Sequence, residues 1–140
     1  MERTNFEKLQ VYQLSEKVAD SVWNIVIAWD AFARDTVGKQ IVRTADSIGA
    51  NIAEDSGRGS LQDNRRFIRM ARGSSYETIH WLRRSYLREL LTQTEIKKLP
   101  MLIEELTPKL NAFLGTGSVC FVARASCALF TGETPVPLSN

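Results

Sequence analysis

The chain has 140 residues, of which 44% are apolar and 24% charged, and its net charge at neutral pH is +2. This size predicts one domain with a core that needs no disulfide or metal, and the ordinary composition excludes a largely disordered or fibrous protein. The polar start does not resemble a secretory signal, and no apolar run reaches the roughly 20 residues that cross a bilayer. We therefore expect a cytoplasmic protein without a membrane partner.

Apolar residues recur at steps of three and four along residues 9–114, which predicts four amphipathic helices. The first extends from Leu9 to Phe32. Gly38 is expected to separate it from a second helix, which ends in the glycine-containing segment at residues 55–59. The apolar stripe of this second helix consists of Ile41, Ala45, Ile48 and Ile52.

The third helix is predicted from Ser60, where residues 60–63 resemble a capping box, to about Leu91. A fourth opens at Thr94 and runs to Phe113. We expect a kink or a break at its two prolines, Pro100 and Pro108.

The predicted fold is an all-α, antiparallel, up-and-down four-helix bundle over residues 1–114. Residues 115–140 lose the helical period, and they are predicted to form a flexible, irregular appendage. This segment contains both cysteines, Cys120 and Cys127, which we interpret as free thiols because no second cysteine pair or histidine cluster completes a metal site.

The third helix has an unusual charge distribution, because eight arginines between residues 58 and 88 are accompanied by only two acids, Asp63 and Glu77. At 100° per residue, a core-facing arc contains Phe67, Ile68, Ala71, Thr78, Ile79, Leu82 and Tyr86. The basic stripe, as we call the arginines outside this arc, has Arg65, Arg69, Arg72 and Arg83 opposite the core, flanked by Arg66, Arg84 and Arg88.

Two interpretations of the basic stripe remain open. It is either a solvated face whose arginine stems cover apolar surface, or a site for an anionic partner, of which nucleic-acid backbone is the most plausible. The scarcity of neighbouring acids favours the second. Four apolar residues on this helix also fall outside the core arc, which suggests self-association through a second buried surface: Met70, Trp81, Leu87 and Leu91.

Three segments carry a resemblance to a known family. They are FEKLQVY at residues 6–12, RTADSIGANIAE at 43–54 and RFIRMARGS at 66–74, the last followed by Glu77. In this order they resemble the motifs of the bacterial family of proteins encoded in intervening sequences of large-subunit ribosomal RNA genes, also called the S23 ribosomal protein family. The match covers roughly residues 5–114. Departures are Thr44, Asp55 and Ser75, where the family usually has Ala, Gly and Leu.

The resemblance implies an antiparallel four-helix bundle that assembles as a ring-like homopentamer and has no catalytic activity. The chain is also similar to accessory proteins of diversity-generating retroelements, which are pentameric, basic and bind nucleic acid. That similarity makes a reverse transcriptase a candidate partner.

The polar residues of the motifs are predicted to form a buried or interfacial network of Arg43, Asn51, Glu54, Ser74 and Glu77, in which Arg43 pairs with one of the two glutamates. An acid–base pair of Glu54 and Glu77 is the alternative. No nucleophile or metal set accompanies them, so we expect no catalytic residues, no metal site and no cofactor. The leading hypothesis is a non-enzymatic oligomer that binds RNA or DNA backbone through the basic stripe, and the second is an adaptor for an acidic protein.

Overall fold

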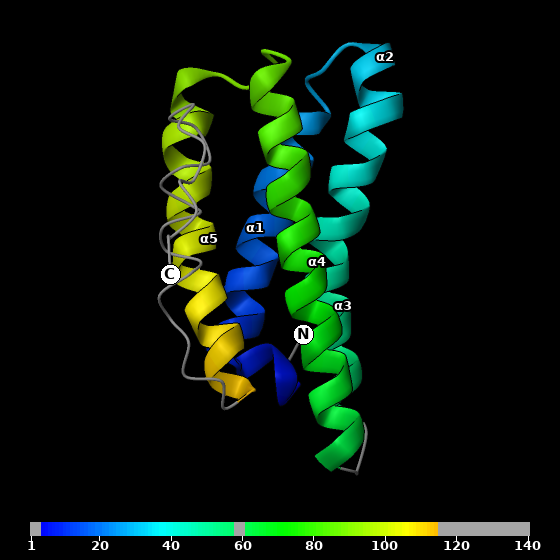
Figure 1. The fold of residues 1–140 in the computed structure, drawn as a ribbon, viewed down its shortest axis with the longest axis vertical. Coiled ribbons are helices and arrows are strands. Elements are labelled where there is room, and N and C mark those ends of the chain that lie inside the picture. The colour runs from blue at the N-terminus through cyan, green and yellow to red at the C-terminus, as the bar shows by residue number, and fades with distance from the viewer. Residues whose placement is uncertain (1–3, 58–60, 115–140) are drawn as a thin grey trace, which may run out of the picture.

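Four long helices form a bundle in a computed structural model that describes residues 4–57 and 61–114 (Figure 1). They are α1 (Gln10–Val26), α3 (Lys39–Ser56), α4 (Leu61–Leu87) and α5 (Gln93–Phe113), and they alternate in direction along the chain. In space, α1 and α4 each pack against both α3 and α5. The short elements are η1 (Phe6–Lys8), α2 (Ala31–Ala33) and η2 (Arg34–Gly38). This arrangement confirms the predicted antiparallel four-helix bundle.

Every long helix contributes one apolar stripe to a single core. The stripe of α1 is built from valines at steps of three or four, and that of α3 from Ile41, Ala45, Ile48 and Ile52, as predicted. On α4, the predicted core arc is buried at Ile68, Ala71, Thr78 and Leu82, and it is half-buried at Phe67, Ile79 and Tyr86. Burial of these stripes supplies most of the stability of the helices, because isolated helices of this length are marginal in water.

The predicted boundary between the first two helices is wrong. α1 ends at Val26, and a new helix begins at Ala31, where the Asp30 carboxylate accepts a hydrogen bond of 3.0 Å from the Ala33 amide. Gly38 does not break this helix, because α2, η2 and α3 follow one another without a gap through a π-helical turn. The space around Gly38 explains the residue instead, since an added Cβ would lie 2.7 Å from Val26 Cγ1.

The turn between α4 and α5 contains both a left-handed residue and a full capping box. Glu89 has φ 58°, and the Leu90 amide donates to the Ser85 carbonyl at 3.0 Å, which closes the end of α4. Thr92 then caps α5. Its hydroxyl accepts from the Glu95 amide at 3.3 Å while the Glu95 carboxylate accepts from the Thr92 amide at 2.7 Å.

α5 runs through Pro100 and Pro108 without interruption, so the predicted break does not occur. A proline inside a helix costs about 3 kcal/mol. Four large apolar side chains of α5 are buried, namely Leu99, Ile103, Leu106 and Leu110, and burial of each stabilises by about 1.5–3 kcal/mol. Packing therefore offsets the cost of the two prolines.

Some predictions concern residues that the structure does not describe. The predicted capping box at residues 60–63 depends on Ser60 and on side chains of residues 61–63, none of which the structure describes. The predicted appendage at residues 115–140 also lies outside the described residues. Within residues 4–57 and 61–114, the structure contains no helix with the length and apolarity that crossing a membrane requires.

Candidate functional site

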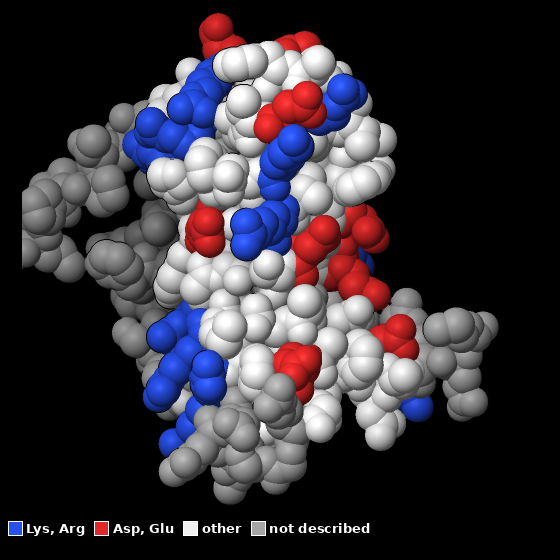
Figure 2. Space-filling model, turned by 90° about the vertical axis from the view of Figure 1, so that its right-hand side faces the viewer, with Lys and Arg blue, Asp and Glu red and all other residues white. Residues whose placement is uncertain are grey.

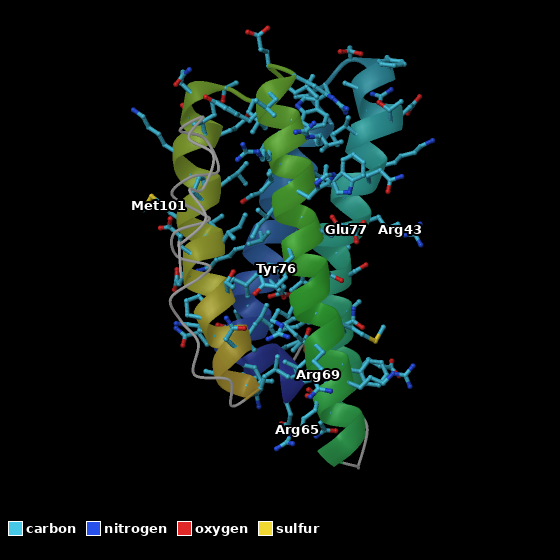
Figure 3. The ribbon with its side chains drawn as sticks, in the orientation of Figure 1. Arg43, Arg65, Arg69, Tyr76, Glu77 and Met101 are labelled. Atoms are coloured by element: carbon cyan, nitrogen blue, oxygen red, sulfur yellow. The ribbon has the colours of Figure 1, made fainter. Side chains whose placement is uncertain are left out.

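The basic stripe of α4 is divided into two flanks. Helical spacing places Arg65, Arg69, Arg72 and Arg83 on the same side of α4 as Tyr76, and Arg66 and Arg84 on the side of Glu77. Figure 3 shows Tyr76 on the side of α4 nearer α5 and Glu77 on the side nearer α3. The stripe therefore borders both neighbouring helices, and it is not a single face opposite the core.

Exposure differs along the stripe. Four of the seven arginines are exposed, namely Arg65, Arg66, Arg69 and Arg88, whereas Arg72, Arg83 and Arg84 are half-buried. The partial burial of Arg72 and Arg83 differs from the prediction, which placed both on the outward face of the helix. Arg65, Arg66 and Arg69, three of the exposed arginines, lie in the N-terminal half of α4. Figure 1 shows the N-terminal end of α4 at the bottom of the view, where it projects beyond α5.

Arg65, Arg66 and Arg69 form no ion pair with any acid whose side chain the structure describes, and these side chains exclude those of residues 58–63. An exposed ion pair at 4.0 Å joins Arg34 and Asp35, far along the chain from α4. Such an exposed pair contributes little stability. The exposed guanidinium groups of Arg65, Arg66 and Arg69 can offer their forked hydrogen-bond donors to an external anion.

Acidic groups gather on a different part of the surface. Figure 2 shows most of the blue groups towards the left-hand side and a cluster of red groups to the right at mid-height. Glu16, Asp20 and Asp46 line a hollow between α1 and α3 of about 190 Å³. Burial, and then the negative charge of Asp20, raise the pKa of the Asp46 carboxyl above its usual range. The small net charge thus conceals a separation of positive and negative surfaces.

The predicted polar network stays a prediction, although the structure places each of its members. Asn51 uses its amide locally, donating to the Ser47 carbonyl at 2.8 Å, and Glu54 is exposed near the end of α3. Arg43 and Glu77 are also exposed, and the described residues contain no ion pair between Arg43 and either glutamate.

Three of the five predicted network residues nevertheless share one site, which we call the α3–α4 hollow. It has a volume of about 320 Å³, and its lining consists of Gln40, Arg43, Thr44, Ser47, Ser74 and Glu77. Figure 3 shows Arg43 and Glu77 at the same level of the bundle, on neighbouring helices. The sequence analysis did not identify Gln40, Thr44 and Ser47 as part of it, although their spacing of three and four on one helix face was visible.

The helices beside this hollow meet through small hydroxyl side chains. Thr44 and Thr78 are buried, and their Oγ1 atoms lie 3.2 Å apart across the α3–α4 interface. Ser75, the second departure from the family motif, is buried on the same face of α4. Small side chains allow the two helices to approach closely, which places Arg43 and Glu77 at the edges of a narrow hollow.

Large apolar side chains are exposed at the end of the bundle where α1 turns into α2. Trp23, Ile27 and Phe32 are 55%, 52% and 80% exposed. Met70 and Leu87 on α4 are exposed as predicted, at 46% and 53%. The prediction is wrong for Trp81 on α4 and for Leu91 in the turn that follows it, because both are partly buried against the core.

Comparison with known proteins agrees with the helical arrangement. The family model described as 23S rRNA-intervening sequence protein matches residues 7–112. Among solved structures, the chain is similar to a protein of unknown function from the S23 ribosomal protein family of Bacteroides thetaiotaomicron, with 25% identity and a TM-score of 0.66, covering 74% of this chain and 97% of that one. None of the curated proteins matches the chain. Because the family model spans most of the bundle, this chain belongs to the 23S rRNA-intervening sequence protein family.

Proposed function

We propose that this protein is a non-enzymatic, oligomeric helical bundle that binds the backbone of RNA or DNA through the basic stripe of α4. The observation that carries the proposal is the exposure of Arg65, Arg66 and Arg69, which have no acidic partner among the side chains that the structure describes. An arginine fork matches the geometry of a phosphate, and each phosphate that it neutralises releases counterions from the nucleic acid.

The separation of charge supports this orientation. The acidic hollow between α1 and α3 repels a polyanion, so the nucleic acid approaches the side of the molecule that carries α4. Contacts to phosphates position a protein but carry little sequence information. The affinity should therefore depend strongly on salt and weakly on sequence.

The test is fluorescence anisotropy with a structured RNA and with a DNA duplex, each over a series of salt concentrations. The variant Arg65→Glu/Arg69→Glu removes two exposed guanidinium groups from one flank of α4. Because each lost phosphate contact lowers the salt slope by about one, the slope of log K against log salt for the duplex should become shallower by about two, with a large loss of affinity.

The matched control is Lys97→Glu/Lys98→Glu, which makes the same change in net charge at two exposed positions of α5. We expect this control to keep most of the affinity and all of the salt slope. Absence of binding by the wild type at low salt would refute the proposal. Equal losses in the two variants would show that only the overall charge matters and would remove the basic stripe as the site.

Self-association is the second part of the proposal. Trp23, Ile27 and Phe32 are exposed near the turn from α1 to α2, and we infer that they belong to an apolar surface that a second copy of the chain covers. Closed symmetric rings are common among oligomers. A ring would place several basic stripes near one another and strengthen the field at each. Light scattering should give the mass of an oligomer, for which we expect a pentamer, and Phe32→Glu should shift it towards the monomer.

The same apolar surface favours one alternative function, a protein–protein adaptor. In that case Trp23, Ile27 and Phe32 would dock another protein, and the basic stripe would contact acidic residues of it. A monomer that fails to bind nucleic acid at low salt would support this alternative.

A further inference from the structure

The α3–α4 hollow has a lining that a purely structural role does not explain. Its six lining residues are all polar or charged, although it lies beside a bundle core that is almost entirely apolar. With a volume of about 320 Å³, it is at the small end of the range of about 300–1,000 Å³ for ligand pockets. A single planar group of the size of a nucleobase fits such a space better than a larger ligand does.

The two charged residues of the hollow, Arg43 and Glu77, lie on opposite helices without neutralising each other. In the described part of the chain, neither takes part in an ion pair or a side-chain hydrogen bond. One edge of the hollow therefore offers a fork of donors and the other a carboxylate with two acceptor oxygens. A ligand that forms hydrogen bonds with both Arg43 and Glu77 must carry acceptors on one edge and donors on another.

The hydroxyl groups between them are partly committed to backbone atoms. Ser47 Oγ donates to the Arg43 carbonyl at 2.7 Å, and Thr44 Oγ1 donates to the Ile41 carbonyl at 3.1 Å. A hydroxyl that has used its proton can still accept a hydrogen bond. The middle of the hollow therefore adds acceptors to those of Glu77, and it favours an occupant with several N–H groups.

Two further donors on the same side of α4 have no acceptor. Trp81 Nε1 and Arg84 Nε are buried, and neither atom has a hydrogen-bond partner among the described residues. Helical spacing places Trp81 one turn and Arg84 two turns beyond Glu77, on the flank that borders α3. Buried donors without partners are costly, so an acceptor such as a phosphate oxygen that reached them from this flank of α4 would stabilise them.

We infer that the α3–α4 hollow binds one unpaired guanine base of an RNA, with Glu77 accepting from guanine N1–H and N2–H and Arg43 donating to O6 and N7. Among the four bases, guanine alone presents two adjacent donor groups to a carboxylate, and its neighbouring edge presents two acceptors to a guanidinium. The flanking phosphate then lies along α4 towards Arg84. An unpaired base splayed from a loop is the usual target of sequence-specific RNA recognition.

The inference rests on the proposed binding of nucleic acid, and it adds a preference for one base. The test uses the full chain and an RNA hairpin whose loop contains one guanine among uridines. Three matched probes replace that guanine with inosine, which lacks the N2 amino group, with 7-deazaguanine, which lacks the N7 acceptor, or with adenine. We expect each replacement to weaken binding at least about fivefold, the lower end of the discrimination of a bidentate contact.

Variants assign the edges of the base to residues. Glu77→Gln should bring the ratio of guanine to inosine affinities to about one, while Arg43→Gln should do the same for guanine and 7-deazaguanine. The control Glu105→Gln makes the charge change of Glu77→Gln at an exposed position of α5, and it should keep the wild-type ratios. Ratios are decisive here because removal of a negative charge raises the affinity for every probe alike.

The outcomes separate the two ideas. Strong, salt-dependent binding with equal affinity for all four probes would overturn the guanine site and leave the proposed backbone binding intact. Absence of binding to any probe would overturn both. A guanine preference that survives in Glu77→Gln and Arg43→Gln would place base recognition elsewhere and overturn this site.

Discussion

Three glycines in helical segments, Gly38 in η2, Gly49 in α3 and Gly73 in α4, provide a matched test of the packing, because one substitution to alanine meets three different surroundings. In the middle of a helix, this substitution stabilises by about 1 kcal/mol through propensity alone. An added Cβ at Gly73 would have nothing within 4 Å. Gly73→Ala should therefore yield most of that gain, measured as a higher midpoint of urea unfolding at an unchanged slope.

The other two positions are crowded. At Gly49 the Cβ would lie 3.0 Å from Ser15 Oγ, and this hydroxyl is held by a hydrogen bond of 2.6 Å to the Tyr12 carbonyl, so we expect the gain to be cancelled. At Gly38 it would lie 2.7 Å from Cγ1 of the buried Val26. Overpacking a core costs about 1–3 kcal/mol, which gives a net loss of about 1 kcal/mol for Gly38→Ala.

The expected order of stability is thus Gly73→Ala above Gly49→Ala above Gly38→Ala. A Gly38→Ala variant as stable as Gly73→Ala would refute the close approach of α1 to the start of α3. A Gly73→Ala variant less stable than the wild type would show that another surface covers this part of α4, and the oligomeric state of that variant would then identify a subunit contact.

Two further predictions concern charge and the core. Asp46→Asn should stabilise the protein at neutral pH, because the raised pKa of Asp46 means that the folded state disfavours the carboxylate. The stability gained by Asp46→Asn should shrink as the pH falls through that raised pKa, and it should vanish below the usual value of 3.8. Unfolding curves over a pH series measure this gain, with Asp35→Asn as the control. A gain that grew in acid would contradict the prediction. Leu82→Ala, at a fully buried position, should lower the free energy of unfolding by about 2–5 kcal/mol. Leu87→Ala, at a side chain that is 53% exposed, should change it by less than about 0.5 kcal/mol. Equal effects in thermal unfolding would show that the core-facing side of α4 is assigned wrongly.

The sequence predicted the helices well wherever an apolar stripe coincided with burial. The apolar residues of α3 repeat at helical spacing and are all buried, namely Ile41, Ala45, Ile48 and Ile52. Their period therefore predicted the helix correctly. The first connection was missed for the converse reason. Phe32 continues the apolar period of α1 at a step of three from Trp29 but is 80% exposed, and the period could not show this. The Asp30 cap was the available signal, because a side chain that accepts from an amide three residues later marks a helix start.

The candidate site was predicted less completely, because angular positions on one helix do not include its neighbours. The position of Arg72 opposite the core followed from helical spacing, but its partial burial did not. In the same way, the motif residues Arg43, Ser74 and Glu77 were identified, whereas the hollow that joins them requires α3 and α4 to be placed side by side.

The close packing of α3 against α4 also has a consequence for the order in which the chain folds. These two helices are consecutive and joined by a short link, so their pairing closes only a small loop. The contact of α1 with α5 instead joins the two ends of the described chain, and it must wait until the intervening helices are in place. We therefore expect the α3–α4 hairpin to act as the folding nucleus and the seam between α1 and α5 to open first on unfolding. The hollow between α3 and α4 would then remain assembled during partial opening of the bundle.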